Sequence, residues 1–544
     1  MALRVASVAS VQRPAEGRDR QPTLVQIAVG NNLNQVGSVH GDTIVVNVAG
    51  RTPPPLPRDR PVARHARDFP DLLGRCEEMD AAREAARTAR PIEFYGPPGI
   101  GKSALLRHMA FRLPAPADGV VWLSAADRPY ADLLEKLFDA FYQMPRPSKL
   151  QANDLLHHLS NVNALLLIDD VGLSRDEVGA LLRALPRATL VLASNERRLW
   201  GEGRSIALAG LMPDEGVELF ARQIGRPLRP NEEAEARRLC VALQGNPLAI
   251  IQSAALTPGE RCQRLAPLGP TGGQAQPASA VLAGLSAPER QIVTALTALD
   301  GAPAQPEHLA AVVRPDAVAP ILWELTERGL IEQTPGNGYR LTGGVAPRLA
   351  GPDLAAWRDW WIDVYARWAS FQKHANPALL PRDTDSIRGL IRWAATAGRY
   401  RDVIRLTRAI EASLTLDRQW RAWSEIVELA RGAAVAAGLP AAEAWALHQQ
   451  GTRALLEGRT DEARAALQRA LEMRRARGDR MGAELTGYHL TLLLPPPPLP
   501  TTANGSAGVG LGSSVKGMLA LMGLLLLLGM GLLGWWQQGS AAGL

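Results

Sequence analysis

The sequence predicts a multidomain α/β + α fold: a parallel-sheet domain with a phosphate-binding loop, followed by helical domains. A glycine-rich loop at residues 96–103 lies between an apolar run, 91–95, and a helical pattern, 104–113. A second apolar run, 163–170, ends in two aspartates, as a central parallel strand does when its carboxyl end faces a ligand. Residues 353–488 form a helical region built in pairs. The chain has 544 residues and is 46% hydrophobic, so it can bury several cores.

The loop reads Gly-Pro-Pro-Gly-Ile-Gly-Lys-Ser, a complete G-x-x-x-x-G-K-[ST] pattern in the strand–loop–helix order that it requires. Its backbone N–H groups and the following helix N-terminus would face phosphates. Lys102 would reach the β- and γ-phosphates, and the Ser103 hydroxyl would bind Mg²⁺. A chance glycine-rich turn is the alternative, but the chain has five lysines among 60 basic residues and places one of them here. We therefore predict a P-loop nucleotide-binding domain over residues 61–205.

The rest of the predicted nucleotide site follows other strands of the same domain. Asp169 would hold Mg²⁺ through water, and Asp170 lies where a water-activating base is needed. Asn195, after an apolar run at 189–193, would sense the γ-phosphate. With a further run at 119–124, four strands alternate with helical patterns, which predicts a parallel sheet with its ligand at the carboxyl edge.

Three further segments resemble parts of one family of signalling ATPases. Residues 72–78 (Leu-Leu-Gly-Arg-Cys-Glu-Glu) carry a hydrophobic-Gly-Arg-x-x-Glu pattern, and residues 208–220 resemble the entry to a small helical lid. Residues 245–250 read Gly-Asn-Pro-Leu-Ala-Ile. Together with the phosphate loop and the acidic strand, they resemble STAND P-loop NTPases of the NB-ARC-like class. The resemblance implies a helical lid over 206–280, with Pro247 packed near the adenine.

Each candidate site residue has one expected role. For catalysis we predict Lys102 and Asp170, and for Mg²⁺ Ser103 and Asp169. The residues predicted to bind ATP or ADP are Gly96, Pro97, Pro98, Gly99, Ile100, Gly101, Lys102, Ser103, Ala104, Arg75, Asn195 and Pro247. The chain departs from the family at two places. Ser194-Asn195 stands where the family often has an arginine, and residues 340–343 (Arg-Leu-Thr-Gly) lack the histidine by which many members contact ADP.

Residues 281–348 are predicted to form a winged helix. Three helical patterns, at 288–298, 306–313 and 321–329, precede a hairpin turn at 335–338. DNA binding would be one function of such a domain. The third helix, however, carries two glutamates and one arginine, the wrong charge for a groove lined with phosphates. We therefore expect no DNA partner, and the resemblance implies a clamp on the nucleotide domain.

Residues 349–490 are predicted to form a tetratricopeptide-like helical domain. The stretch that begins at Gly398 is echoed by the one that begins at Gly458, with small residues at similar spacing. Such units stack into a superhelix with a concave face for a protein partner or trigger. The cluster in the first helix has helical spacing and is expected to be core rather than a ligand cage. Its members are Trp357, Trp360, Trp361 and Trp368.

The two ends of the chain have their own compositions. Residues 1–60 comprise a β-hairpin-like leader, nearly uncharged over 22–48, and a Pro/Arg linker, and the leader is either partly disordered or pairs with other copies. Residues 491–514 are a second linker. Residues 515–536 are predicted to be a transmembrane helix, because 20 uncharged residues match a hydrocarbon core of about 30 Å. The segment would make the chain a single-pass, tail-anchored protein. Three well-separated cysteines fit a reducing cytosol, so we expect the bulk of the chain to be cytoplasmic.

These observations favour a membrane-anchored ATP/ADP switch with slow ATPase activity. It would oligomerise on activation, and by family analogy its output would be a prokaryotic defence or cell-death response. Two alternatives stay open: a transcriptional regulator that uses the winged helix on DNA, and a membrane-tethered AAA-like ATPase with fast turnover.

Overall fold

The computed structural model describes residues 39–40, 43–44, 54–61, 68–126, 128–144, 149–201, 203–265, 276–334, 336–343, 345 and 354–493. The chain divides into two compact units, Met1–Leu494 and Pro495–Leu544. The second unit, with the predicted membrane helix at 515–536, lies outside the described residues. Within the described ranges, no helix has the length and apolar character needed to cross a bilayer.

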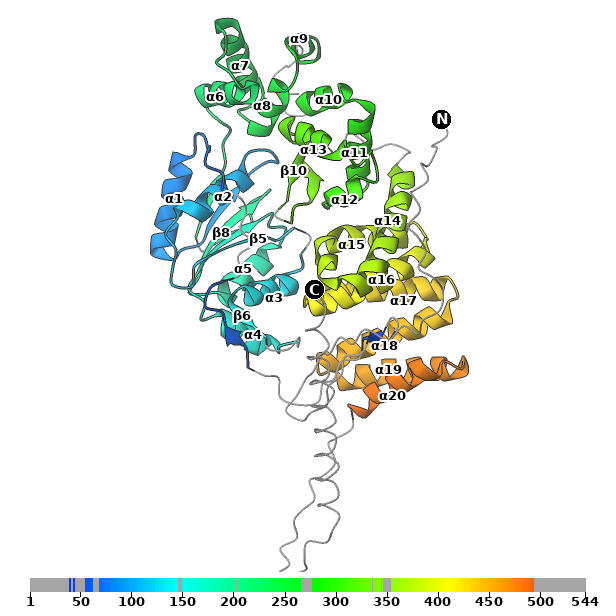
Figure 1. Ribbon diagram of the computed structural model, residues 1–544. Helices are drawn as coiled ribbons and strands as arrows, with labels where there is room; N and C mark the ends of the chain where they lie inside the picture. The colour runs from blue at the N-terminus through cyan, green and yellow to red at the C-terminus, as the bar shows by residue number, and fades with distance from the viewer. Residues whose placement is uncertain are drawn as a thin grey trace, which may run out of the picture. The chain divides into compact units, whose positions relative to one another are not determined.

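Five parallel strands form the sheet of the nucleotide domain (Figure 1). They are β4 (Ile92–Tyr95), β5 (Val120–Ser124), β7 (Leu165–Asp169), β8 (Thr189–Ser194) and β9 (Arg204–Ala207). Their order across the sheet is β5-β7-β8-β4-β9. The predicted parallel sheet is therefore present, with one strand more than the sequence indicated. We missed β9 because it is a partly exposed edge strand with an arginine and a serine among its four residues.

Helices cover both faces of this sheet. They are α1 (Cys76–Thr88), α2 (Lys102–Arg112), α3 (Tyr130–Phe141), α4 (Ala152–Leu159) and α5 (Arg175–Ala184). Since side chains alternate along a strand, the apolar run of β7 serves two cores. Leu165 and Leu167 belong to the core with α1 and α2, and Leu166 and Ile168 to the core with α3, α4 and α5. A strand buried on both faces explains why β7 reads as an unbroken apolar run.

Part of the segment interpreted as a Pro/Arg linker is attached to this domain. β3 (Leu56–Pro57) pairs antiparallel with β6 (Tyr142–Gln143), and Arg58 Nε donates to the carbonyl oxygens of Asp139 (3.0 Å) and Tyr142 (3.2 Å). In the leader, β1 (Val39–His40) and β2 (Thr43–Ile44) form a short antiparallel pair. The rest of the leader lies outside the described residues.

The next segments are helical and end in a hairpin. The four helices after the sheet are α6 (Pro213–Ile224), α7 (Pro230–Ala242), α8 (Pro247–Ala254) and α9 (Pro258–Leu265). After them come α10 (Gln276–Ala283), α11 (Ala287–Thr297), α12 (Pro306–Leu309), α13 (Val318–Glu327), β10 (Ile331–Gln333) and β11 (Tyr339–Leu341). β10 and β11 pair antiparallel, with Ile331 opposite Leu341. The second helix of the expected winged helix is shorter than predicted, because it ends at Leu309. The winged-helix assignment itself stays a prediction.

Helical repeats occupy the remainder of the described chain (Figure 1). They begin with α14 (Leu354–Ala375), the 3-10 turn η2 (Pro377–Arg382) and α15 (Thr384–Thr396). They continue with α16 (Tyr400–Leu416), α17 (Trp420–Ala436), α18 (Pro440–Leu456), α19 (Thr460–Ala476) and α20 (Arg480–Thr491). These five helices start at residues 400, 420, 440, 460 and 480, so a helix pair repeats every 40 residues. Tetratricopeptide units repeat every 34 residues. Gly398 precedes α16 and Gly458 precedes α19, so the predicted echo compares helices of opposite direction.

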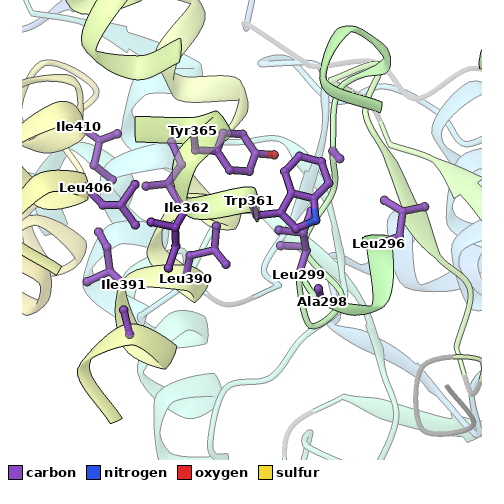
Figure 2. Close-up of a cluster of buried hydrophobic side chains, with 14 of the residues drawn as sticks. Leu296, Ala298, Leu299, Trp361, Ile362, Tyr365, Leu390, Ile391, Leu406 and Ile410 are labelled. Carbon is purple, nitrogen blue, oxygen red and sulfur yellow. The ribbon is translucent and has the colours of Figure 1, made fainter. Parts of the chain in front are cut away.

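The tryptophan cluster of α14 is part of the core, as predicted. Trp361 is fully buried beside Leu299 and Tyr365 (Figure 2), and its indole N–H donates to the Ala295 carbonyl oxygen at 2.7 Å. The other three tryptophans are partly buried against the same core. This core joins the helix α11 to the first repeat helices.

Candidate functional site

The phosphate loop connects β4 to α2 at the carboxyl edge of the sheet. Gly99 has φ 81° and Gly101 has φ 98°, which are left-handed conformations that suit glycine. Gly96 N–H donates to the Ser194 carbonyl oxygen of β8 at 3.2 Å, so the loop leaves the sheet beside the next strand. The helix α2 begins at Lys102, and its N-terminus therefore follows the loop directly. This is the geometry that an anion-binding loop requires.

Lys102 is directed back into its own loop. Its side chain is largely buried, and Nζ donates to the carbonyl oxygens of Gly96 (2.7 Å) and Pro97 (3.1 Å). Burial lowers the pKa of Lys102, while the charges of Asp169 and Asp170 oppose that shift. The ammonium group is thus held in a partly desolvated position, where an anionic partner would stabilise its charge.

Asp169 and Ser103 lie side by side below the loop. Burial and the charge of Asp170 raise the pKa of Asp169 to about 6, and a hydrogen bond from the Ser103 hydroxyl opposes that rise. The Asp170 N–H donates to Asp169 Oδ1 at 3.0 Å. Asp170 itself has φ 53°, an uncommon conformation for a residue with a side chain.

These two side chains fit the donor chemistry that Mg²⁺ prefers. A hydroxyl and a carboxylate are hard oxygen ligands, and Mg²⁺ is commonly held by one or two carboxylates together with substrate phosphates. No group of three or more His, Cys, Asp or Glu side chains that could hold a metal occurs in the described part of the chain. A Mg²⁺ ion held by Ser103 and Asp169 would take its other ligands from nucleotide phosphates and water.

Arg75 supports the loop from behind. Its guanidinium donates through Nη2 to the Ile100 carbonyl oxygen at 3.0 Å and through Nη1 to Glu78 Oε1 at 3.0 Å. The side chain is buried, and it also lines the cavity described below. We predicted Arg75 as a nucleotide-binding residue, and its observed contacts are with the backbone of the loop and with the helix α1.

Glu93 organises the segment that carries Asn195, and the sequence did not reveal it. This carboxylate lies in the middle of β4 with no exposed surface. It accepts hydrogen bonds from the Ser194 hydroxyl (2.8 Å), the Arg198 N–H (2.7 Å) and the Leu199 N–H (3.0 Å). An acidic residue within an apolar strand is the signal that could have identified it, since a buried carboxylate needs partners.

The N-terminus of α8 covers the loop. Asn246 caps this helix by accepting from the Ala249 N–H at 3.1 Å, and its Nδ2 donates to the Pro98 carbonyl oxygen at 3.2 Å. The Leu248 N–H donates to the Gly99 carbonyl oxygen at 3.2 Å. Pro247 occupies the first turn of α8, as its place in the predicted motif implies. Asn246 was missed, although it is a strong N-cap residue type directly before a proline.

Arg340 of β11 reaches the acidic end of β7. Its Nη2 donates to Asp170 Oδ2 at 3.0 Å, and its Nε donates to Glu332 Oε1 of β10 at 2.7 Å. Burial opposes the charge, but Glu332 and Asp170 together raise the pKa of Arg340. We predicted Asp170 as a water-activating base; in this arrangement its carboxylate is engaged in an ion pair instead. The sequence offered no signal for this pairing beyond an arginine in a hairpin.

One cavity of about 600 Å³ brings most of these residues together. Of the predicted site residues, those that line it are Arg75, Pro98, Gly99, Ile100, Gly101, Lys102, Ser103, Ala104, Asp170, Asn195 and Pro247. Gly96, Pro97 and Asp169 lie just outside the lining. Thr326, Glu327 and Arg340 contribute from α13 and β11. The volume is within the range typical of small-molecule sites.

No protein-family model matches the chain, and no curated protein matches it. Three solved structures are similar in part. A signal transduction ATPase with numerous domains (STAND) with a tetratricopeptide repeat sensor, from Pyrococcus horikoshii, has 15% identity and a TM-score of 0.43 over 79% of this chain and 81% of its own. A Walker-type ATPase of Pyrococcus abyssi has 16% identity and a TM-score of 0.27 over 53% and 97%. A RuvB point mutant of Thermotoga maritima has 18% identity and a TM-score of 0.25 over 52% and 98%. At such low TM-scores, these likenesses carry no conclusion about what this chain binds.

Proposed function

We propose that this chain is a nucleotide-dependent switch in which ADP or ATP, with Mg²⁺, binds the cavity at the carboxyl edge of the sheet. One observation carries the proposal: the phosphate loop is covered by α8, while Arg340 of the hairpin pairs with Asp170 beside it. A site closed by two later segments of the chain is suited to holding a nucleotide and releasing it only after those segments move.

Each residue of the site has a role in this proposal. Lys102 and the loop N–H groups bind the β- and γ-phosphates, and α2 adds its positive helix end. Ser103 and Asp169 hold Mg²⁺, which, when bound, would neutralise charge that develops on the phosphates. Asp170 orients the attacking water once its carboxylate is released. Hydrolysis is slow and returns the molecule to the ADP state.

The Arg340–Asp170 ion pair sets the order of events. A carboxylate that accepts a hydrogen bond from a guanidinium at 3.0 Å has that oxygen engaged and is not positioned to take a proton from water. The hairpin must therefore leave before Asp170 can act as a base. Departure of the hairpin also uncovers the nucleotide, so exchange and hydrolysis would both respond to the same movement.

Membrane attachment and assembly complete the proposal. The uncharged stretch at 517–536, after a linker rich in small residues, supports a single-pass anchor through residues 515–536 with the bulk of the chain cytoplasmic. Activated protomers would associate, cluster their anchors and so act in defence or cell death. Deletion of residues 515–544 should leave nucleotide binding intact. The shortened chain should no longer remain in the membrane fraction after carbonate extraction. Carbonate release of the full-length chain would contradict the anchor.

The nucleotide carried by the purified chain tests the switch itself. We expect tightly bound ADP, identified after denaturation. We also expect Arg340→Ala to release fluorescent ADP about 10-fold faster or more, since a hydrogen bond to a charged group contributes about 1.5–3 kcal/mol. Arg314→Ala is the matched control, because Arg314 belongs to the same region, is exposed and pairs with Asp316 away from the cavity. Equal release rates in the two variants would rule out the Arg340 contact as the restraint.

A further inference from the structure

A second cavity lies within the helical repeats, apart from the nucleotide site. It has a volume of about 560 Å³. Its walls come from the C-terminal part of α14, the first half of α16, the start of α18 and the turn that follows α19. No residue of the proposed nucleotide site lines it. The proposed switch mechanism therefore leaves this cavity without a role.

The lining is strongly basic. Its charged or titratable residues are Lys373, His374, Arg401, Arg405, Arg408 and Arg477. Within the part of the chain that the structure describes, no aspartate or glutamate lines the cavity. Four arginines and a lysine around one hollow favour an anion inside it, and a concave wall of low dielectric strengthens the field there.

The cations fall into two groups. Three of them are held by protein contacts: Arg405 pairs with Asp363 at 2.7 Å, Lys373 Nζ donates to the Arg408 carbonyl oxygen at 3.0 Å, and the Arg408 guanidinium lies 4.9 Å from the centre of the Trp445 ring. The other two, Arg401 and Arg477, are discussed next. These contacts hold the three side chains in place around the hollow, since they have little freedom to turn away.

Arg401 and Arg477 are both exposed at this cavity. Among the residues that the structure describes, neither guanidinium has an ion-pair partner. They extend from different elements, one from the first turn of α16 and the other from the end of α19, yet both line the same cavity. Two guanidinium groups without an ion pair in the described chain, both lining one cavity, can together bind one oxyanion group.

The rest of the lining is apolar. Ile404 and Ala409 of α16, Leu439 before α18, and Pro440 to Ala442 at its start form this part. A bare inorganic ion would leave that surface without a partner, whereas an organic ligand would cover it. The lining therefore combines a cationic rim with an apolar floor.

We propose that this cavity binds a small organic phosphate, a monoester whose phosphate is held by Arg401 and Arg477 and whose apolar part rests on Ile404 and Leu439. A phosphate monoester carries about −1.5 to −2 charge at pH 7, so several cations attract it more strongly than they attract the single charge of a carboxylate. Arginine also matches the geometry of phosphate oxygens through paired N–H groups.

The position of α16 connects this cavity to the nucleotide domain. The helix, Tyr400–Leu416, carries the cavity residue Arg401 in its first turn, and the next residues, Asp417 and Arg418, form ion pairs with α3 of the sheet domain. The ligand would thus act on the contact between the repeats and the sheet domain. This last step rests on the proposed switch function, whereas binding to the cavity does not.

The test measures binding of phenyl phosphate, inorganic phosphate and benzoate by calorimetry. The full chain carries Lys102→Ala, so the phosphate loop contributes nothing to the signal. We expect phenyl phosphate to bind most tightly, inorganic phosphate less tightly because it lacks an apolar part, and benzoate least tightly because it carries one charge. In the Arg401→Ala/Arg477→Ala double variant, phenyl phosphate affinity should fall by about 10-fold or more.

Arg431→Ala is the matched control, because Arg431 is an exposed arginine of α17 that does not line the cavity. It should bind phenyl phosphate as the parent does. Thermal unfolding of the double variant should also be unchanged, since neither arginine pairs with another described residue. Three results would overturn the proposal: no binding of phenyl phosphate, equal affinity in the double variant and the control, or benzoate binding as tightly as phenyl phosphate. Nucleotide affinity measured on the double variant without Lys102→Ala tests the switch separately.

Discussion

Lys102 is the residue for which sequence and structure agree most directly. Its ammonium group is partly desolvated and donates to two carbonyl oxygens of its own loop. These contacts pre-position the charge where phosphates of a bound nucleotide would lie. The sequence identified it because the pattern is local: eight consecutive residues determine the loop, and a short apolar strand and a helix flank it.

We predict that Lys102→Ala abolishes nucleotide binding. No other lysine lines the cavity, so the loss is about 100-fold or more in affinity if any binding persists. Titration with a fluorescent ATP analogue measures it. Arg112→Ala serves as the control, because Arg112 ends the same helix and pairs with Asp68 outside the cavity. An analogue that binds Lys102→Ala with parental affinity would show that the site lies elsewhere.

Asp170 and Arg340 allow two substitutions that break one ion pair with opposite effects. Asp170→Asn should keep ATP bound and abolish hydrolysis, because the base is lost. Arg340→Ala should raise turnover several-fold, because the base is released. Phosphate release under single-turnover conditions compares the two variants. If both variants lower the rate equally, the pair is structural and Asp170 is not the base.

At the scale of single elements, two stacked histidines in the last repeats make the stability of their helices depend on pH. The rings of His448 and His489 lie 4.7 Å apart between centroids, with Arg474 close to them on α19. Burial and the charge of Arg474 lower the pKa of His489 to about 4, and burial lowers the pKa of His448 as well. The His489 Nδ1 and the Thr452 hydroxyl are 2.9 Å apart.

We predict that these helices lose stability as the pH falls from about 6.5 to 4. The unfolded chain takes up a proton on His489 below 6.5, whereas the folded chain does so only near 4, so a depressed pKa gives stability that is complete above 6.5. The loss reaches about 3 kcal/mol for this group alone. Urea unfolding followed by circular dichroism at pH 7 and pH 5 measures the effect.

His489→Leu should make this pH dependence shallower, because the substituted side chain cannot titrate. His374→Leu is the control, since His374 is an exposed histidine at the end of α14. The idea fails if the two variants show the same difference between pH 7 and pH 5 as the parent.

At the scale of the whole molecule, charged residues join α3 of the sheet domain to the turn before α17. Arg418 pairs with Glu135 and with Asp139, the latter at 2.7 Å. The carboxylate of Asp132 accepts from the backbone N–H groups of Arg421 and Ala422, each at 2.9 Å. Burial raises the pKa of Glu135 to about 7, although Arg418 opposes that shift. This contact therefore buries the Glu135 carboxylate, whose charge is stabilised by Arg418.

We predict that Arg418→Ala separates the repeats from the sheet domain. Removing one member of a buried pair leaves an uncompensated charge and costs about 3–5 kcal/mol. Small-angle X-ray scattering should then show a larger radius of gyration. Arg421→Ala is the control, because the Asp132 contact uses its backbone and not its side chain. An unchanged radius for Arg418→Ala would mean that other contacts hold the two regions together.

Sequence reasoning covered the local parts of the fold and the site. Runs of apolar residues located four of the five strands, and β9 escaped because an exposed edge strand needs no apolar run. Helical spacing placed the tryptophans in the core. The predicted echo of Gly398 at Gly458 joined helices of opposite direction, since glycines precede both kinds of repeat helix (Gly398, Gly438, Gly458 and Gly478 all have positive φ) and their spacing alone does not separate the two.

The sequence by itself determined the α/β class, the phosphate loop with Lys102 and the helical repeats, because each depends on residues within one or two turns or strands. Only the tertiary structure decided that Arg340 pairs with Asp170, that Arg418 pairs with Glu135, and that a second cavity brings arginines of α16 together with Arg477 after α19. These pairings join residues far apart in the chain. Their partners are chosen by how whole helices and strands pack, which no local pattern of residue types encodes.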